Sequence, residues 1–424
     1  MMNLKKIKFG RHRFIYMNKS KKFKSIGISV VYKMKFDDKN ISAFNILAKY
    51  LGNCSANYPS IESFNKQIDN LYGSAVGIKS EYVGSLFTVN FFINFINPKY
   101  IQDDNFCEEI LTFFHDMIYR PLFNQEGYFQ EDIFNICKQN CLVDVESLDE
   151  YNMGYVLKKL KKTISQNNHS AMASSSLGDK KVLQHFNHKN ILKYYRRLLH
   201  APFDIYVTGE YSFLKMEKIL RKYFSKKGIQ KIDYSVFDLI EKKTYEPIRI
   251  YKNISQAKVA VAYRIPVLFN QPEQYAFRIA RLVLSGTLSS KFGKVIREKM
   301  GLCYSISSTY SAYYGTFIVT TGVSSENILK VIDEIDHQIN ELKKGNISDE
   351  EFLQAKEGIQ NDLLSIDDTL FGTLNMIKTY TNFSSSFVLE EELKKYNQIQ
   401  KEDVIKVSQL LTFCCYCVLD KESL

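Results

Sequence analysis

Alternating apolar and polar positions mark the strands that the sequence predicts. In SIGISVVYKMKF (residues 25–36), apolar side chains occupy every second position from Ile26 to Met34. Side chains in a strand alternate between its two faces, so the pattern predicts a strand with one face buried on a sheet. The expected elements that follow are helices at about 40–52 and 60–71, strands at about 73–80 and 86–95, helices at about 104–120, 126–165 and 187–199, a strand at 203–210 and a helix that ends near Phe224.

The second half of the chain repeats this order of elements. A capping box is expected at the start of one of its helices, because Ser348 is followed three residues later by Glu351. The repeat predicts two related α/β halves. The expected elements of the second half are a strand at 256–265, helices at 272–285 and 288–300, strands at about 303–310 and 316–323, helices at 326–343 and 348–366, closing helices, and a final strand at 413–419.

The stretch SKKGIQKIDYSVFDLIEKKTYEP (residues 225–247) separates the two halves. Charged residues become frequent there and the apolar periodicity is lost, which is typical of a linker. We therefore expect one domain over residues 1–224 and a second over residues 248–424. A chain of 424 residues is long enough to bury a hydrophobic core in each of them.

The chain is basic, with a net charge of +11. Basic surfaces attract nucleic-acid backbones, but here Lys and Arg are spread along the whole length. No helix-turn-helix, zinc-finger or RNP pattern accompanies them. We expect a generally basic, solvated surface and no nucleic-acid partner. Such a surface is compatible with an acidic partner or a peptide substrate.

No segment of the sequence predicts export or membrane insertion. The N-terminal stretch MMNLKKIKFGRHRFIYMNKS has charges throughout and lacks the apolar core of a signal peptide. A long uncharged run, Tyr82 to Pro98, contains three Asn residues and alternates like a strand. We expect a soluble cytoplasmic protein without a membrane partner.

Neither the cysteines nor the histidines form a metal-binding pattern. Three of the eight cysteines lie close together in LTFCCYCVLD, an apolar strand-like run in which packing in a core is expected. Of the seven histidines, only His185 and His188 are near each other, and no carboxylate stands in a matching position. We expect reduced thiols, surface or capping histidines, and no metal in this chain.

Arg297 and Tyr304 stand seven residues apart in SSKFGKVIREKMGLCYSISS, where a basic helix meets a strand at Gly301. A solvated Arg and a half-buried Tyr would be ordinary at such positions. However, the stretch resembles the C-terminal half of the insulinase-like metallopeptidases (the pitrilysin or M16 family), which carry an Arg and a Tyr at this spacing. YSAYYGTFIVTTGVSSENI, which follows it, resembles the same family. So do ANYPSIESFNKQIDNLYGSAVG (56–77) and residues 174–212 in the first half.

The resemblance covers nearly the whole chain and implies a fold. It is the α+β fold of the insulinase and mitochondrial-processing-peptidase type, with two tandem homologous halves joined by a linker. Each half of that fold is a mostly antiparallel sheet packed with helices.

Active members of the family carry an inverted zinc motif, His-x-x-Glu-His, at a fixed distance before the Tyr-Pro of NYPS. Two imidazoles four residues apart lie on one helix face and can bind one zinc, while the Glu acts as base for a water. Here the three positions fall on Asn45, Ala48 and Lys49, and none of them supplies that chemistry. The family's later zinc-binding Glu would fall near Asn140, where we find no matching Glu.

Bacterial members of this family often work as heterodimers, in which one subunit has the zinc motif and the other supplies the Arg and Tyr. This chain resembles the second kind. Its overall pattern is similar to the Firmicute insulinase-like proteins associated with elongation factor P modification, which also lack the motif.

The resemblance implies that Arg297 and Tyr304 bind the carbonyl or oxyanion of a peptide in the partner's zinc site, and that the isolated chain is inactive. Zinc is then expected in the partner alone. The substrate would be a leader peptide, another short peptide or a processing substrate. A catalytically inactive structural or peptide-binding subunit is the alternative, and a nucleic-acid-binding protein is a third hypothesis.

Overall fold

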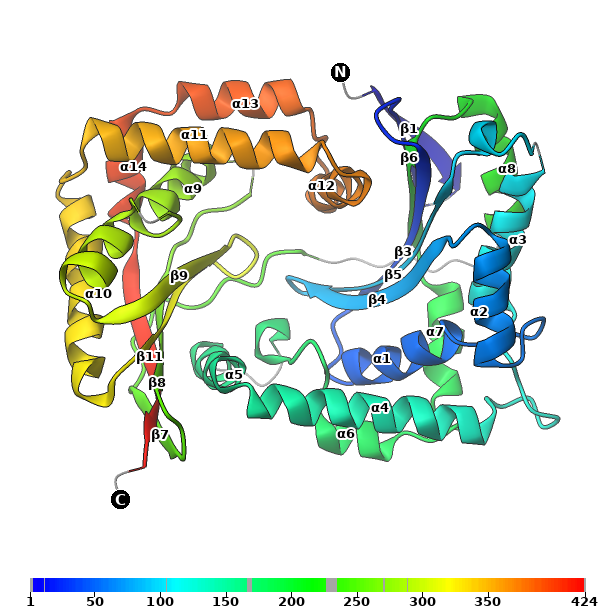
Figure 1. Cartoon of the computed structure of the whole chain (residues 1–424), viewed down its shortest axis with the longest axis horizontal. Helices are drawn as coiled ribbons and strands as arrows, with labels where there is room; N and C mark the ends of the chain where they lie inside the picture. Colours follow the sequence, from blue (N-terminus) through cyan, green and yellow to red (C-terminus); the bar gives the residue numbers. More distant parts are fainter. Residues whose placement is uncertain are drawn as a thin grey trace. The chain divides into compact units, whose positions relative to one another are not determined.

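The computed structural model describes residues 3–10, 12–103, 105–165, 170–225, 235–269, 271–287 and 289–422. The chain forms two compact units, each with its own sheet and helices (Figure 1). The first unit comprises Met1–Val145, Ser175–Val236 and Ser365–Phe387, and the second comprises Glu146–Ser174, Phe237–Leu364 and Val388–Leu424.

The two sheets share one strand order. The first is β1-β2-β6-β3-β5-β4 and the second is β7-β11-β8-β10-β9, so the last five strands of the first sheet correspond to the five of the second. The pairs β2/β6 and β7/β11 are parallel and the other described pairs are antiparallel. The predicted α+β fold with two related halves is confirmed. The strands are β1 (Asn3–Gly10), β2 (Arg13–Lys19), β3 (Ser25–Lys35), β4 (Ala75–Val83), β5 (Leu86–Ile96), β6 (Phe203–Gly209), β7 (Ile248–Lys252), β8 (Ala257–Arg264), β9 (Cys303–Ser311), β10 (Thr316–Val323) and β11 (Thr412–Lys421).

The main core of the first unit lies between one face of its sheet and several helices. The alternating apolar positions of β3, from Ile26 to Met34, are buried in this core together with the apolar faces of the helices. Burial of these faces is the main driving force for folding of the unit. The helices of its first two segments are α1 (Asn40–Leu51), α2 (Ile61–Asn70), α3 (Phe106–Tyr119), α4 (Glu131–Glu150, which crosses the unit boundary), α6 (Lys180–His185), α7 (Leu192–His200) and α8 (Phe213–Phe224), with the short 3-10 helix η1 (Pro98–Tyr100).

The second unit has the corresponding arrangement. Phe277 of α9 packs against the sheet, with its ring centroid 4.8 Å from that of Tyr310 and 5.7 Å from that of Phe317. Its predicted capping box is present, because Ser348 and Glu351 exchange side chain-to-backbone hydrogen bonds at the start of α11. Its helices are α9 (Pro272–Leu284), η3 (Phe292–Lys299), η4 (Ser325–Asn327), α10 (Ile328–Lys343), α11 (Asp349–Ile366, which ends in the first unit), α13 (Leu389–Gln398) and α14 (Lys401–Ser408).

Each unit also contains one helix from the other half of the sequence. In the first unit, Leu370, Leu374 and Ile377 of α12 (Leu370–Asn382) form an apolar cluster with side chains of β2, β3 and β6, on the sheet face opposite the main core. Gly27 makes this contact possible, because a Cβ there would lie 2.2 Å from a side-chain carbon of Leu370.

Helix α5 (Asn152–Ile164), from the first half of the sequence, packs on the sheet of the second unit together with η2 (Ala171–Ala173). Val156, Leu160 and Ile164 cluster with β8 and β11, whose Cys415 and Cys417 are buried among them. The cysteines of LTFCCYCVLD therefore pack in a core, as their apolar surroundings suggested. The predicted domains 1–224 and 248–424 follow the sequence repeat, whereas the compact units exchange residues 146–174 and 365–387.

Three predicted helices differ from the structure. The helix expected at 187–199 begins only at Leu192, where α7 starts. The continuous helix expected at 126–165 is broken into α4 and α5 at Tyr151, whose backbone is extended. The break follows closely after the unit boundary at residue 145, because the chain must turn there to lay α5 on a different sheet. The helix expected at 288–300 is a π-helix over Phe292–Lys299.

The N-terminal strands and the linker show what the sequence pattern missed. Strands β1, β2 and β7 were not expected. Strands β1 and β7 lie at the edges of their sheets, whereas β2 lies inside its sheet and is buried at most positions, so it lacks the alternation that marks a strand with one exposed face. Of the linker expected at 225–247, residues 226–234 lie outside the described residues, and β7 starts directly after it at Ile248.

Lys378 of α12 gives the first unit a testable pH dependence. Burial lowers the pKa of its ammonium from 10.5 to about 8, with an opposing contribution from Glu81. With its amide oxygen turned toward α12, Asn90 accepts a hydrogen bond from Lys378 Nζ at 3.0 Å. Between pH 8 and 10.5 the unfolded state therefore binds more protons than the folded state, and stability rises with pH.

We expect Lys378→Met to remove this rise and to stabilise the unit below pH 8 by on the order of 2 kcal/mol. The free energy of unfolding is measured in urea at a series of pH values, and hydrogen exchange of the β3 and β5 amides reports it for the first unit. Exposed Lys394→Met is the control. Equal pH profiles for wild type and Lys378→Met would contradict the assignment.

Candidate functional site

Arg297 and Tyr304 lie side by side in the second unit. Arg297 is near the end of η3, Gly301 turns the chain with a left-handed φ of +63°, and Tyr304 is the second residue of β9. This turn favours glycine because it has no Cβ to clash. The guanidinium carbon of Arg297 is 5.5 Å from the centre of the Tyr304 ring. The turn thus brings together two residues that are seven positions apart.

Both side chains are available to a ligand. Tyr304 is 83% exposed, which is unusual for a large aromatic residue on a strand. Arg297 is half-buried, and within the described residues its guanidinium has no hydrogen bond or ion pair. A guanidinium offers five N–H donors and a phenol offers one, so the pair can donate several hydrogen bonds to one oxygen or to two neighbouring oxygens.

The segment around Arg297 is held from its N-terminal end. Lys291, directly before η3, forms a nearly buried ion pair with Glu351 of α11 at 3.2 Å. The π-helical form is seen in the hydrogen bond from the Met300 N–H to the Val295 carbonyl at 2.9 Å, five residues earlier. π-helical turns are rare and frequently occur at functional sites. Here the wider turn sets where Arg297 points relative to β9.

The positions of the family's zinc motif lie together in the first unit. Asn45, Ala48 and Lys49 of α1 line a cavity of about 370 Å³, together with Ser80 and Asp144. The Asn45 amide is already engaged. Its Nδ2 donates to the Ser176 carbonyl at 3.0 Å, and its Oδ1 accepts from the Ser80 hydroxyl at 2.5 Å.

A salt bridge lies among these positions. Lys49 Nζ is 3.0 Å from Asp144 of α4. Burial alone would lower the pKa of Lys49, but its hydrogen bond to Asp144 and the Asp144 charge raise the pKa above its usual value. The ammonium therefore stays protonated at neutral pH and repels a metal cation.

These residues do not fit a catalytic zinc. Ala48 has no basic group, and Lys49 has no free lone pair while it is protonated. Cys141 also lines the cavity, but burial raises the pKa of its thiol to about 12, so the thiolate that zinc prefers is not formed. In the described part of the chain, no three His, Cys, Asp or Glu side chains are grouped so that they could hold a metal ion.

Asp144 was missed by sequence reasoning, which looked for a carboxylate near Asn140. The two positions are four residues apart on α4 and therefore lie on the same helix face. A search for any acidic residue one turn further would have found it. Its partner Lys49 could not have been foreseen, because the ion pair depends on how α4 packs against α1.

The two neighbouring histidines, His185 and His188, are held by local contacts of the first unit. His188 Nδ1 lies 3.4 Å from Glu131, and His185 lies in the last turn of α6.

No helix in the described part of the chain is both long and apolar enough to cross a membrane.

Comparisons with known proteins agree with this geometry. Residues 185–359 match the family model described as Peptidase M16 inactive domain. The chain is 21% identical over 397 residues to the probable inactive metalloprotease YmfF of Bacillus subtilis, and the match covers 92% of each chain.

Solved structures show the same fold. The crystal structure of a conserved protein from Enterococcus faecalis has a TM-score of 0.91 at 21% identity, covering 99% of both chains. A peptidase M16 inactive domain from Pseudomonas fluorescens has a TM-score of 0.80 at 14% identity, also covering 99% of both chains. In the sequence of residues 185–359 the chain is thus similar to the inactive domain of the M16 peptidases, and over most of its length it is similar to a probable inactive metalloprotease.

Proposed function

We propose that this chain is the non-catalytic subunit of a heterodimeric zinc metallopeptidase. In this proposal a homologous subunit with the His-x-x-Glu-His motif carries the zinc, and this chain supplies Arg297 and Tyr304. The observation that carries the proposal is the pairing of these two side chains, one exposed on β9 and the other without a partner among the described residues. A purely structural subunit would have no need for both donors.

Arg297 and Tyr304 would act on the carbonyl oxygen of the scissile peptide. As the bond is attacked, negative charge develops on that oxygen, so hydrogen bonds to it become stronger in the transition state than in the ground state. The guanidinium supplies a cationic donor and the phenol a neutral one. The cation–π contact of Arg297 with the Tyr304 ring keeps the two side chains next to each other.

A cytoplasmic location belongs to the same proposal. All eight cysteines of the chain are free, which suits a reducing compartment. The substrate class consists of extended peptides, such as a leader peptide or a processing substrate. The alternative is a catalytically inactive structural or peptide-binding subunit of a complex.

Reconstitution tests the proposal. The isolated chain is expected to cleave no fluorogenic peptide and to contain no stoichiometric zinc by mass spectrometry. A mixture with a zinc-motif M16 subunit, identified by co-purification, is expected to cleave peptides much faster than that subunit alone. If the mixture is no faster than the zinc subunit alone, the donor role is wrong and the structural alternative is favoured.

A further inference from the structure

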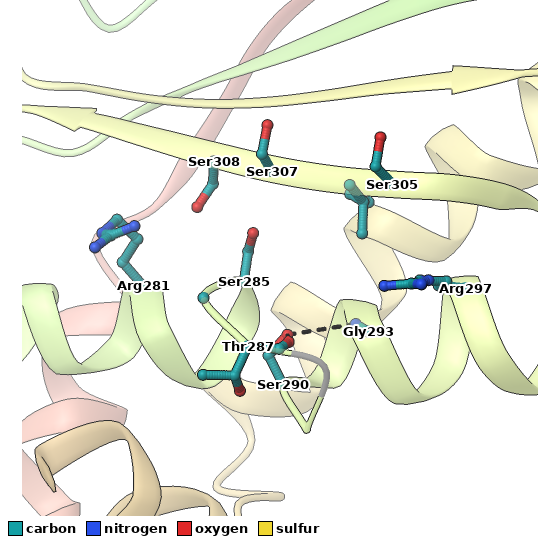
Figure 2. Close-up of a pocket in the computed structure, with 11 residues that line it drawn as sticks. Arg281, Ser285, Thr287, Ser290, Gly293, Arg297, Ser305, Ser307 and Ser308 are labelled. Carbon is teal, nitrogen blue, oxygen red and sulfur yellow. Dashed lines mark hydrogen bonds between the residues drawn. The ribbon is translucent and has the colours of Figure 1, made fainter. Parts of the chain in front are cut away.

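A polar cavity of about 450 Å³ adjoins Arg297 in the second unit. It lies between the end of α9, residues 285–287, Ser290, η3 and β9. Figure 2 shows Arg281 at one end and Arg297 at the other, with serine and threonine side chains between them. Among the described residues that line it there is no Asp or Glu, so the cavity has two cationic ends and no opposing charge in its lining.

Arg281 has unused donors. Burial lowers the pKa of its guanidinium, against an opposing effect of Asp362, but an Arg side chain remains protonated at neutral pH. Within the described residues this guanidinium has no hydrogen bond or ion pair. A charged group that has lost part of its water and has no hydrogen-bonded partner gains much from a bound anion.

Hydroxyl groups line the space between the two arginines. The Ser308 hydroxyl oxygen is buried and has no hydrogen-bond partner among the described residues. Figure 2 shows the Ser285 hydroxyl pointing toward it from the end of α9. Ser290, in contrast, already donates to the Thr287 carbonyl at 2.6 Å. Ser285 and Ser308 are therefore the hydroxyls that can bind a ligand between the guanidinium groups.

The cavity lies beside a strand that can accept another strand. Among the described strands, β9 pairs with β10 alone and is the last in its sheet. Tyr310 faces α9, and Ser308, two residues earlier, faces the same side because side chains alternate along a strand. A peptide that pairs with the open edge of β9 would direct every second side chain toward this side.

We propose that this cavity binds a carboxylate of the substrate peptide, held by Arg281 with Ser285 and Ser308 at the end of the cavity away from Arg297, while the peptide pairs with the edge of β9. The carboxylate belongs to an Asp or Glu side chain or to the C-terminus. This subsite rests on the proposed function, because Arg297 and Tyr304 mark the position of the scissile bond. Tyr304 and Ser308 are four residues apart, so at about 3.3 Å per residue the carboxylate lies within about four residues of that bond.

Peptide binding tests the subsite without any cleavage. The probe is a short fluorescent peptide of Thr and Val with one central Glu, acetylated and amidated, and its anisotropy is measured on the isolated chain and on the reconstituted pair. A Gln version removes the charge, and a third version has a free C-terminal carboxylate and no acidic side chain. The Glu peptide is expected to bind about tenfold or more tightly than the Gln peptide.

Arg281→Gln is expected to abolish that preference, and Arg281→Lys to keep part of it. Lys294→Gln is the matched control, because Lys294 is exposed on η3 and does not line the cavity. Ser308→Ala is a second variant with little risk to folding and should reduce the preference severalfold. A stronger response from the peptide with the free C-terminus would identify the terminal carboxylate as the ligand.

Equal binding of the Glu peptide, the Gln peptide and the peptide with the free C-terminus, by the isolated chain and by the pair, overturns the subsite. An equal loss of the preference for the Glu peptide with Arg281→Gln and with Lys294→Gln also overturns the subsite, because the preference would then reflect only the general positive charge of the chain. Failure of the pair to cleave peptides would instead contradict the proposed function. The preference for a carboxylate would still be measured, because the anisotropy test needs no cleavage.

Discussion

Replacing Arg297 by Ala in the reconstituted pair is expected to lower the rate of peptide cleavage about a hundred- to a thousandfold, as removal of one oxyanion donor does in other enzymes. The guanidinium has no competing partner among the described residues, so the lost hydrogen bonds would be those made to the substrate. The loss should appear mainly in kcat, because the developing oxyanion is bound more strongly than the neutral carbonyl.

Tyr304→Phe separates the hydroxyl from the ring. Phe keeps the surface on which Arg297 stacks and removes only the donor, so a reduced rate with intact stacking would assign the effect to the hydroxyl. Because Tyr304 is 83% exposed, neither stability nor folding should change.

Lys299→Ala is the matched control for both variants. Lys299 is an exposed cation on η3 and does not line the cavity. Size-exclusion chromatography of each pair checks that assembly is unchanged. Wild-type rates for both Arg297→Ala and Tyr304→Phe would show that these side chains are not the donors.

Asp204→Ala is expected to destabilise the first unit by about 3–5 kcal/mol, the usual cost of leaving one member of a buried ion pair without its partner. Lys33 Nζ is 2.7 Å from Asp204 Oδ2, and the two side chains are only 9% and 6% exposed. Asp204 Oδ1 also accepts a hydrogen bond from the Phe14 N–H at 2.8 Å, so the carboxylate joins strands β2, β3 and β6.

Native-state hydrogen exchange of β3 and β6 amides measures this loss within the first unit. Lys22→Ala is the control, because Lys22 pairs with Asp367 in the same unit but is 54% exposed, and an exposed pair contributes about 1 kcal/mol or less. The double variant Lys33→Met/Asp204→Leu should recover much of the loss, since an apolar pair of similar volume replaces a buried ion pair at little cost. A loss for Asp204→Ala no larger than for Lys22→Ala would refute the prediction.

The sequence alone determined the repeated order of strands and helices. The alternation in β3 and the matching stretches of the second half follow from which residues are apolar, and both sheets have the expected central strands. The sequence also determined that the zinc motif is missing. Metal ligation needs particular side-chain atoms, and no packing can give a ligand or a base to Ala48.

Only the tertiary structure decided how these elements are combined. The exchange of α5 and α12 between the units, the ion pair of Lys49 with Asp144, and the cavity between Arg281 and Arg297 all join residues that are far apart in the sequence or that lie on different elements. Hydrophobic patterning specifies that a helix has an apolar face, but it does not specify which sheet that face covers. That choice depends on the fit between surfaces, such as the space that Gly27 leaves for Leu370, and it can be read only from the packed chain.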